Sequence, residues 1–169
     1  MIEMQVMGVA LDTKTGSPIV VLNDKENRMA LPIWIGSAEA SAIIRQMENI
    51  ASARPMTHDL ICNLIKTFEY NVTKIEINDV NTETYYASIF LAAKDGTVFE
   101  MDSRPSDAIA IALKTKSPIY VATKVIANGT ISTDHDRDEQ EAEEFRKFVS
   151  ELKPSDFKKV IEGNEESNQ

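Results

Sequence analysis

Two short boxes in the sequence combine an arginine, a hydroxyl side chain and an aspartate, residue types that bind phosphate groups and divalent cations. The first spans residues 54–61 (Arg-Pro-Met-Thr-His-Asp-Leu-Ile), and the second spans residues 104–109 (Arg-Pro-Ser-Asp-Ala-Ile). Proline suits the first turn of a helix, and Thr57 and Ser106 can cap a helix by accepting bonds from its unpaired N–H groups. We therefore expect each box to surround a helix N-terminus, where the helix dipole favours anions.

These boxes predict one phosphate-processing site. The predicted catalytic residues are His58, Asp59 and Asp107, with His58 as a base or a ligand. The predicted phosphate contacts are Arg54, Arg104, Thr57 and Ser106. The predicted metal ligands are Asp59, Asp102 and Asp107. Mg²⁺ or Mn²⁺ is the expected cofactor, because one or two carboxylates and the substrate's own phosphates suffice to bind such a cation.

The same residues also admit a purely structural explanation. An acid in the first turn of a helix complements the helix dipole, which would account for Glu39 as well. Arg54 and Arg104 can pair with nearby acids and fix helix starts. We expect Trp34 in the core or at a subunit interface, and His135 to be solvated within its charge run. The two explanations differ in whether both boxes converge on one open cleft.

Several other kinds of phosphate or metal site are excluded by the sequence. The chain has two histidines and six scattered glycines, which leaves no paired-histidine mechanism and no glycine loop that could cradle a phosphate. No Cys/His spacing suits zinc. Cys62 is the single cysteine and cannot form an internal disulfide, which agrees with a reducing cytoplasm.

The net charge of −9 is unevenly distributed. Residues 1–133 carry 12 basic and 15 acidic side chains, whereas residues 134–169 carry 6 and 12. The near-neutral body has no basic stripe, so tight binding of nucleic acid is not expected, although nucleic acid could be a substrate held by few contacts and a cation. No apolar run approaches the length of a membrane span, and the N-terminus lacks a basic signal region. We therefore expect a cytoplasmic protein that does not bind membranes.

Residue periodicity predicts an α+β fold. Strands are expected over residues 2–11, 17–22, 29–35, 71–78, 84–93, 98–102 and 119–121, with tight turns at Asp95-Gly96 and Asn128-Gly129. Pro32 places the third of these strands at an edge or a bulge. Helices are expected over 37–50, 57–68, 105–114 and 142–152, with the third buried. This order indicates a single domain built on a mixed β-sheet with about four helices.

Four stretches resemble the bifunctional nuclease family: residues 31–40 (LPIWIGSAEA), 54–60 (RPMTHDL), 103–110 (SRPSDAIA) and, more weakly, 148–157 (FVSELKPSDF). The resemblance places a bifunctional-nuclease-like domain over residues 1–157. It includes part of an acidic C-terminal helical segment, 133–161, that precedes a disordered tail, 162–169. It implies a single α+β domain found in bacterial cytoplasmic proteins, usually oligomeric. Because DNase and RNase activity is reported for some members, the resemblance also implies a hydrolase, but it assigns no catalytic residues.

Two functions from different classes therefore stay open. The first is a divalent-metal-dependent nuclease that hydrolyses phosphodiester bonds of DNA or RNA with low specificity. The second is a non-catalytic oligomeric module that binds an anionic ligand or a protein partner. In either case we expect a homo-oligomer, most simply a two-fold dimer. Trp34, the helix over 105–114 and the Phe145/Phe148 face supply more apolar surface than one small core needs.

Deleting residues 163–169 should leave the melting temperature almost unchanged. This segment has no apolar side chain to bury. Thermal unfolding of the shortened and full-length chains tests the prediction, and a loss of more than a few degrees would contradict it.

Overall fold

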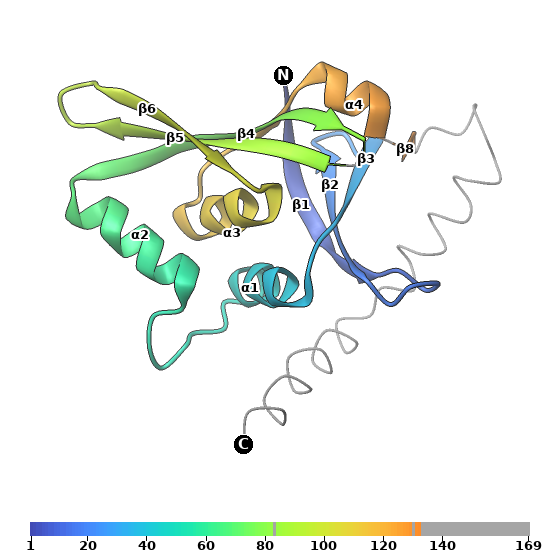
Figure 1. Cartoon of the computed structure of the whole chain (residues 1–169), viewed down its shortest axis with the longest axis horizontal. Helices are drawn as coiled ribbons and strands as arrows, with labels where there is room; N and C mark the ends of the chain where they lie inside the picture. The colour runs from blue at the N-terminus through green and yellow to red at the C-terminus, as the bar shows by residue number, and fades with distance from the viewer. Residues whose placement is uncertain (83, 130, 133–169) are drawn as a thin grey trace.

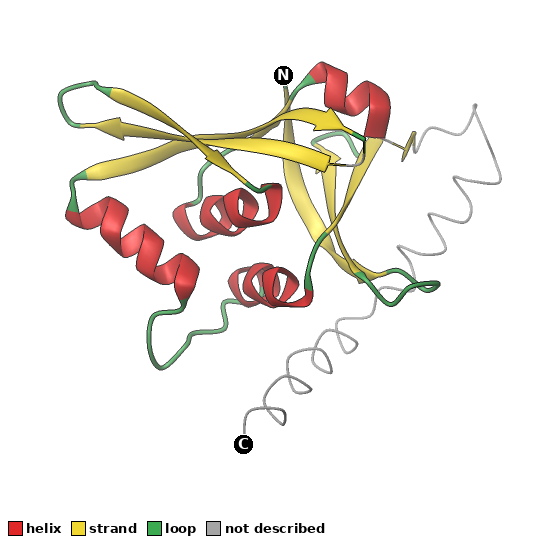
Figure 2. Ribbon diagram, in the orientation of Figure 1, coloured by secondary structure: helices red, strands yellow, loops and turns green. Residues whose placement is uncertain are grey.

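The computed structural model describes residues 1–82, 84–129 and 131–132. The predictions for residues 133–161, for the tail 162–169 and for His135, Phe145 and Phe148 lie outside the described residues. Within them, the elements follow the order β1-β2-β3-α1-α2-β4-β5-β6-α3-β7-α4-β8. The chain forms one mixed sheet with helices packed against it (Figure 1, Figure 2), which confirms the predicted α+β class.

The sheet has eight strands among the described residues, in the spatial order β6-β5-β4-β7-β1-β2-β3-β8. In that order the strands are Val98–Ser103, Thr84–Ala93, Tyr70–Asn81, Ile119–Val121, Ile2–Leu11, Pro18–Asp24, Met29–Trp34 and Ile131–Ser132. Neighbours are antiparallel except β4 and β7, which run parallel. The three-residue β7 therefore joins the N-terminal strands β1–β3 to the later strands β4–β6.

Two turn and edge predictions are confirmed by the strand register. The β5–β6 hairpin turns at Gly96, whose φ of 88° glycine adopts without strain. On β3, Pro32 lies opposite Val21 of β2. The other side of β3 is paired, within the described residues, only at Met29 and Ala30. Pro32 thus stands on an edge segment, where its missing N–H interrupts no ladder.

Helix α3 (Pro105–Thr115) is the central helix of the fold. It lies between the sheet and helix α1 (Ser37–Met47), with α2 (Thr57–Thr67) alongside (Figure 1). Its buried residues are Pro105, Ser106 and residues 108–112, which confirms the predicted buried helix. By contrast, no residue of α2 is buried. No helix among the described residues has both the length and the apolar character needed to cross a membrane.

One expectation from the sequence is wrong, and a second is reduced to one of its two alternatives. Asn128-Gly129 indicated a turn, but both residues belong to helix α4 (Thr123–Gly129). The helix has only seven residues, too few for a clear apolar period, and it is anchored by the buried side chains of Val125 and Ile126. Of the two places expected for Trp34, the core is excluded because its side chain is 56% exposed, and the subunit interface stays a prediction. Its Nε1–H donates a hydrogen bond to Asp12 Oδ2 at 3.3 Å.

Candidate functional site

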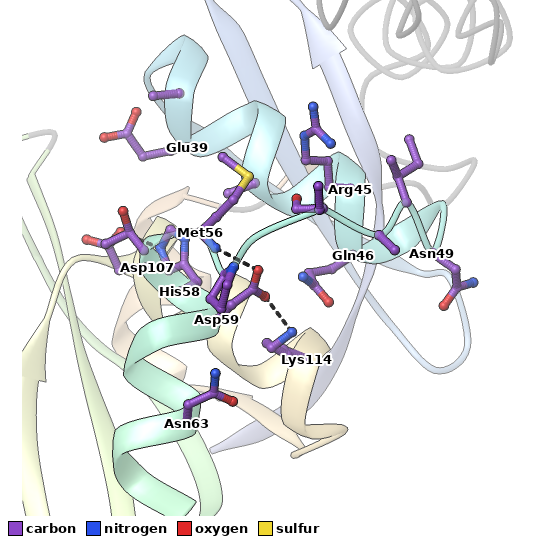
Figure 3. Close-up of a pocket in the computed structure, with 18 of the residues that line it drawn as sticks. Glu39, Arg45, Gln46, Asn49, Met56, His58, Asp59, Asn63, Asp107 and Lys114 are labelled. Atoms are coloured by element: carbon purple, nitrogen blue, oxygen red, sulfur yellow. Dashed lines mark hydrogen bonds and ion pairs between the residues drawn. The ribbon is translucent and has the colours of Figure 1, made fainter.

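The first turns of three helices contribute carboxylates to one cavity. The residues that precede the first helical positions are Gly36 in α1, Met56 in α2 and Arg104 in α3. Counted from them, Glu39, Asp59 and Asp107 each occupy the third helical position. All three line a cavity of about 620 Å³ (Figure 3). The helix dipole favours an acid in each first turn, and the fold brings the three acids together.

His58 links the two boxes directly. Its Nε2 lies 2.9 Å from Asp107 Oδ1 (Figure 3), although the residues are far apart in the sequence. An ionised carboxylate only accepts hydrogen bonds, so Nε2 carries the proton in this contact. In the neutral imidazole, Nδ1 is then the nitrogen that can accept a proton. The boxes therefore converge on one site and are not buried separately.

Arg104 bridges two of the three carboxylates. Its Nε donates to Asp107 Oδ2 at 2.7 Å, and its Nη1 donates to Glu39 Oε1 at 2.8 Å. Partial burial raises the pKa of Asp107, but hydrogen bonds from Arg104 and His58 outweigh this effect and hold the pKa below its usual value. The bonds to Asp107 and Glu39 also raise the pKa of Arg104. At neutral pH the cavity therefore holds an ionised Asp107 beside a protonated Arg104.

Asp59 fastens the start of α2 to the end of α3. Its Oδ2 accepts a hydrogen bond from the backbone N–H of Met56 at 2.9 Å. Its Oδ1 pairs with Lys114 Nζ at 2.5 Å (Figure 3). Hydrogen bonding by Lys114, followed by the Met56 N–H, lowers the pKa of Asp59. Asp59 thus holds α2 against α3 and also places a negative charge in the lining of the cavity.

The structure brings together five of the predicted site residues and separates the others. The five that line the cavity are Thr57, His58, Asp59, Arg104 and Asp107. Ser106 lies in the first turn of α3 but is only 6% exposed and is not part of the cavity lining. Asp102 is exposed on β6 opposite Ser88, away from the cavity lining. Arg54 is exposed and is likewise absent from the lining.

The prediction that Thr57 and Ser106 cap their helices is wrong. The residues at the cap positions are Met56 and Arg104, both in extended conformation, and neither helix has a side-chain cap of the predicted kind. Pro105 occupies the first helical position and makes Arg104 the cap, which shifts Ser106 into the first turn. In the first box the helix begins two residues after its proline. This offset brings Asp59 to the same helical position as Asp107.

The predicted metal ligands do not form a preformed cation site. No group of three or more His, Cys, Asp or Glu side chains is placed to hold a metal ion in the described part of the chain. Asp59 is paired with Lys114, and both oxygens of Asp107 are engaged by other groups. The Arg104 guanidinium bonds to both Asp107 and Glu39, the two acids that a cation would have to share.

Three charged residues of the cavity were not among the predicted site residues. They are Glu39, for which the sequence alone suggests only a first-turn acid, and Arg45 and Lys114, for which it suggests no role. The signal for Glu39 was available: Gly36-Ser37-Ala38-Glu39 places an acid in the first turn of a helix, as both boxes do. Arg45 and Lys114 gave no comparable signal, because only tertiary packing brings the ends of α1 and α3 to the cavity.

The fold and the cavity together define an α+β protein with a charged site between three helices. The model of the bifunctional nuclease domain matches residues 20–134, a range that includes every residue lining the cavity. This chain belongs to the bifunctional nuclease domain family.

Relatives agree with this assignment. An uncharacterized protein of Mycobacterium tuberculosis is 32% identical over 92% of this chain and 98% of its own length. Bifunctional nuclease 1 of Arabidopsis thaliana is 31% identical over 69% of this chain and 39% of its own length. Bifunctional nuclease 2 of Oryza sativa subsp. japonica is 33% identical over 62% of this chain and 33% of its own length. The likeness to the plant proteins therefore covers only a part of each.

Asp59→Asn should reduce stability at neutral pH more than in acid. The folded state lowers the pKa of Asp59, so its contribution is present above the unfolded value of about 3.9 and is lost as the pH falls through the folded value. We expect a gap of about 1 kcal/mol between wild type and variant at pH 6 that narrows by pH 3. Urea unfolding at both pH values measures it.

Asp102→Asn is the matched control, because it removes the same charge from an exposed site on β6. Its gap to wild type should be small at both pH values. An Asp59→Asn gap that stays constant or widens in acid would contradict the assigned role of the Asp59–Lys114 pair.

Proposed function

We propose that this protein hydrolyses phosphodiester bonds of DNA or RNA with low sequence specificity, and that the cavity between α1, α2 and α3 is its active site. The observation that carries the proposal is the convergence of both boxes on this cavity through the His58–Asp107 contact. Family membership and the names of the plant relatives support the same activity class.

In the proposed mechanism, His58 is the general base. Asp107 holds the imidazole through Nε2, which leaves Nδ1 to take a proton from an attacking water molecule. The carboxylate also stabilises the imidazolium that forms, as in other His–Asp pairs. Arg104 is the proposed phosphate contact, because a guanidinium binds phosphate oxygens in a fork geometry and its side chain is 65% exposed. Thr57 adds a hydroxyl from the first turn of α2.

Weak binding of nucleic acid follows from the charges of the cavity. Arg104 and Lys114 are each already paired with a carboxylate of this chain. A nucleic acid that neutralises few free cations releases few counterions, so its affinity should be modest and only weakly dependent on salt. We propose nucleic acid as a transient substrate, without a tightly bound complex.

The requirement for Mg²⁺ or Mn²⁺ stays a prediction. The three predicted ligands do not converge, as described above, so a cation would have to enter with the phosphates of the substrate. Titration with a chelator and restoration by each metal test the requirement independently of the residue roles proposed here.

The non-catalytic module is the second candidate, and the ion pairs favour it. Each of the three first-turn acids is engaged by a basic side chain, an arrangement that also fits a purely architectural role. In that case the cavity would bind an anionic ligand or a protein partner without chemistry. Activity measurements on matched variants separate the two candidates.

We also propose a cytoplasmic location for the protein. Cys62 is a free cysteine in α2, and burial raises the pKa of its thiol. A thiol that stays protonated is poorly reactive and is stable in a reducing compartment.

His58→Ala and Asp107→Asn should each lower nuclease activity by about tenfold or more, because each removes one residue of the His58–Asp107 pair that forms the proposed general base. Asp107→Asn keeps the size of the side chain but leaves the imidazole without an ionised acceptor. Cleavage of a labelled single-stranded DNA and RNA, with all proteins purified identically, provides the measurement.

Asp102→Asn is the control for this experiment, because Asp102 lies outside the cavity. Circular dichroism establishes that each variant is folded. Equal cleavage by wild type and the Asp107→Asn/His58→Ala double variant would identify a contaminating nuclease and leave the binding module as the function.

We further propose that the protein is a homodimer, formed through an apolar face of α2 and β6. This face consists of Leu60, Leu64 and Phe68 together with Phe99 and Met101, which are 47–68% exposed. The α2 residues are four apart and therefore share one side of the helix. β6 is the terminal strand of the sheet, so its outer edge has no partner among the described residues. Exposed apolar patches next to an open strand edge are typical of interfaces between subunits.

Leu64→Glu should convert the dimer to a monomer, because it places a charge in the middle of the proposed interface. Light scattering at micromolar concentration measures the mass of wild type and variant. Leu11→Glu, at an exposed apolar position on β1, is the control and should stay dimeric. A monomeric wild type at this concentration would refute the proposal.

A further inference from the structure

Arg104 is held between two acids that belong to different helices and bind different nitrogen atoms of its guanidinium. Asp107 lies on the same helix as Arg104 and binds its Nε. Glu39 lies on α1 and binds Nη1 from across the cavity. The Glu39 side chain is 19% exposed and that of Arg104 is 65% exposed, so solvent reaches the guanidinium more easily than the Glu39 carboxylate. The guanidinium is therefore oriented by one acid and occupied by another.

A carboxylate and a phosphate compete for the same guanidinium hydrogen atoms. The carboxylate is planar and the phosphate is tetrahedral, but both can accept two parallel N–H bonds from the fork of an arginine guanidinium. The Nη1 bond to Glu39 thus fills a position that an incoming phosphate needs. The Nε bond to Asp107 can persist during the exchange, because it uses the other side of the guanidinium.

Gly36 makes the position of Glu39 possible. The Glu39 carboxylate folds back over Gly36 so closely that a methyl group added there would overlap its Oε2 atom. Gly36 has a φ of −79°, which any residue can adopt, so backbone conformation does not demand a glycine. What the missing side chain provides is room for the Glu39 carboxylate beside Arg104.

We propose that Glu39 is an internal competitor of the substrate phosphate: it occupies Arg104 in the ligand-free protein and is displaced when a phosphate binds. This inference rests on the proposed function of the cavity and assigns Glu39 a positioning role in it. Glu39 keeps a cation in an open cavity from binding anions indiscriminately. When the substrate leaves, Glu39 pairs with Arg104 again, so the charge of the guanidinium is neutralised in the empty cavity.

Calorimetric titration with inorganic phosphate and with thymidine 3′,5′-bisphosphate, in buffer without divalent metal, tests the proposal. Glu39→Gln should bind both probes about two- to fivefold more tightly than wild type, the range expected for releasing one partly exposed ion pair. Gly36→Ala should shift affinity in the same direction without changing any charge, because it displaces the Glu39 carboxylate. Melting curves establish that both variants are folded.

Two controls separate competition from a general charge effect. Glu48→Gln removes an exposed acid from the end of α1, outside the cavity lining, and should leave the affinity unchanged. In an Arg104→Gln background, Glu39→Gln should give no gain, since the competition requires the guanidinium. A gain that survives in this background overturns the proposal, as does equal or weaker binding by Glu39→Gln or no measurable binding by any variant.

The outcome is distinguishable from that of the proposed nuclease function. The titrations measure anion binding without catalysis, whereas the proposed function stands or falls with cleavage by the wild-type protein. Phosphate competition without cleavage would support this inference and favour the binding module.

Discussion

Burial of α3 is the constraint on which the rest of the structure depends. A helix that is apolar on nearly every side is stable only where other elements cover it, and here β4 and β5 cover one side while α1 and α2 cover another. The charged residues of α3 are confined to its ends, where Arg104 and Asp107 begin the helix and Lys114 closes it. The elements that bury the middle of α3 must pass these ends, which is why acids of α1 and α2 meet them. The cavity is therefore a consequence of covering one apolar helix.

The acids of the cavity satisfy two electrostatic demands at once. Each lies in the first turn of a helix, where it complements the dipole. Each also pairs with a basic side chain, either on another helix or at Arg104, the residue just before α3. Because the two demands point in the same direction, a structural role and a chemical role for Asp59, Asp107 and Glu39 are compatible. A near-neutral chain body can in this way hold a strongly charged site without a basic surface.

Much of the fold could be predicted from the sequence, because its signals are local. Alternation located the strands, Asp95-Gly96 located a hairpin, and the continuous apolar run from Ala108 to Leu113 indicated a buried helix. The site was predicted only in part. His58 and Asp107 were named from their boxes, but nothing local indicates that Nε2 of one lies against the other. Lys114, Arg45 and the exposure of Trp34 depend on contacts between distant segments, and α4 is too short to show a period.

The position of β7 has a consequence for how the chain folds. The strand order places β7 between β4 and β1, so within the described part of the chain the N-terminal meander of β1–β3 and the later meander of β4–β6 share no direct ladder. Ile119–Val121 joins the two meanders through register contacts with both Ile2–Met4 and Ile75–Ile77. A ribosome must therefore release residue 121 before the sheet can close, because β1 cannot be connected to β4 until β7 has been synthesised. We expect closure of the sheet to be a late step, since contacts of such long sequence separation form slowly.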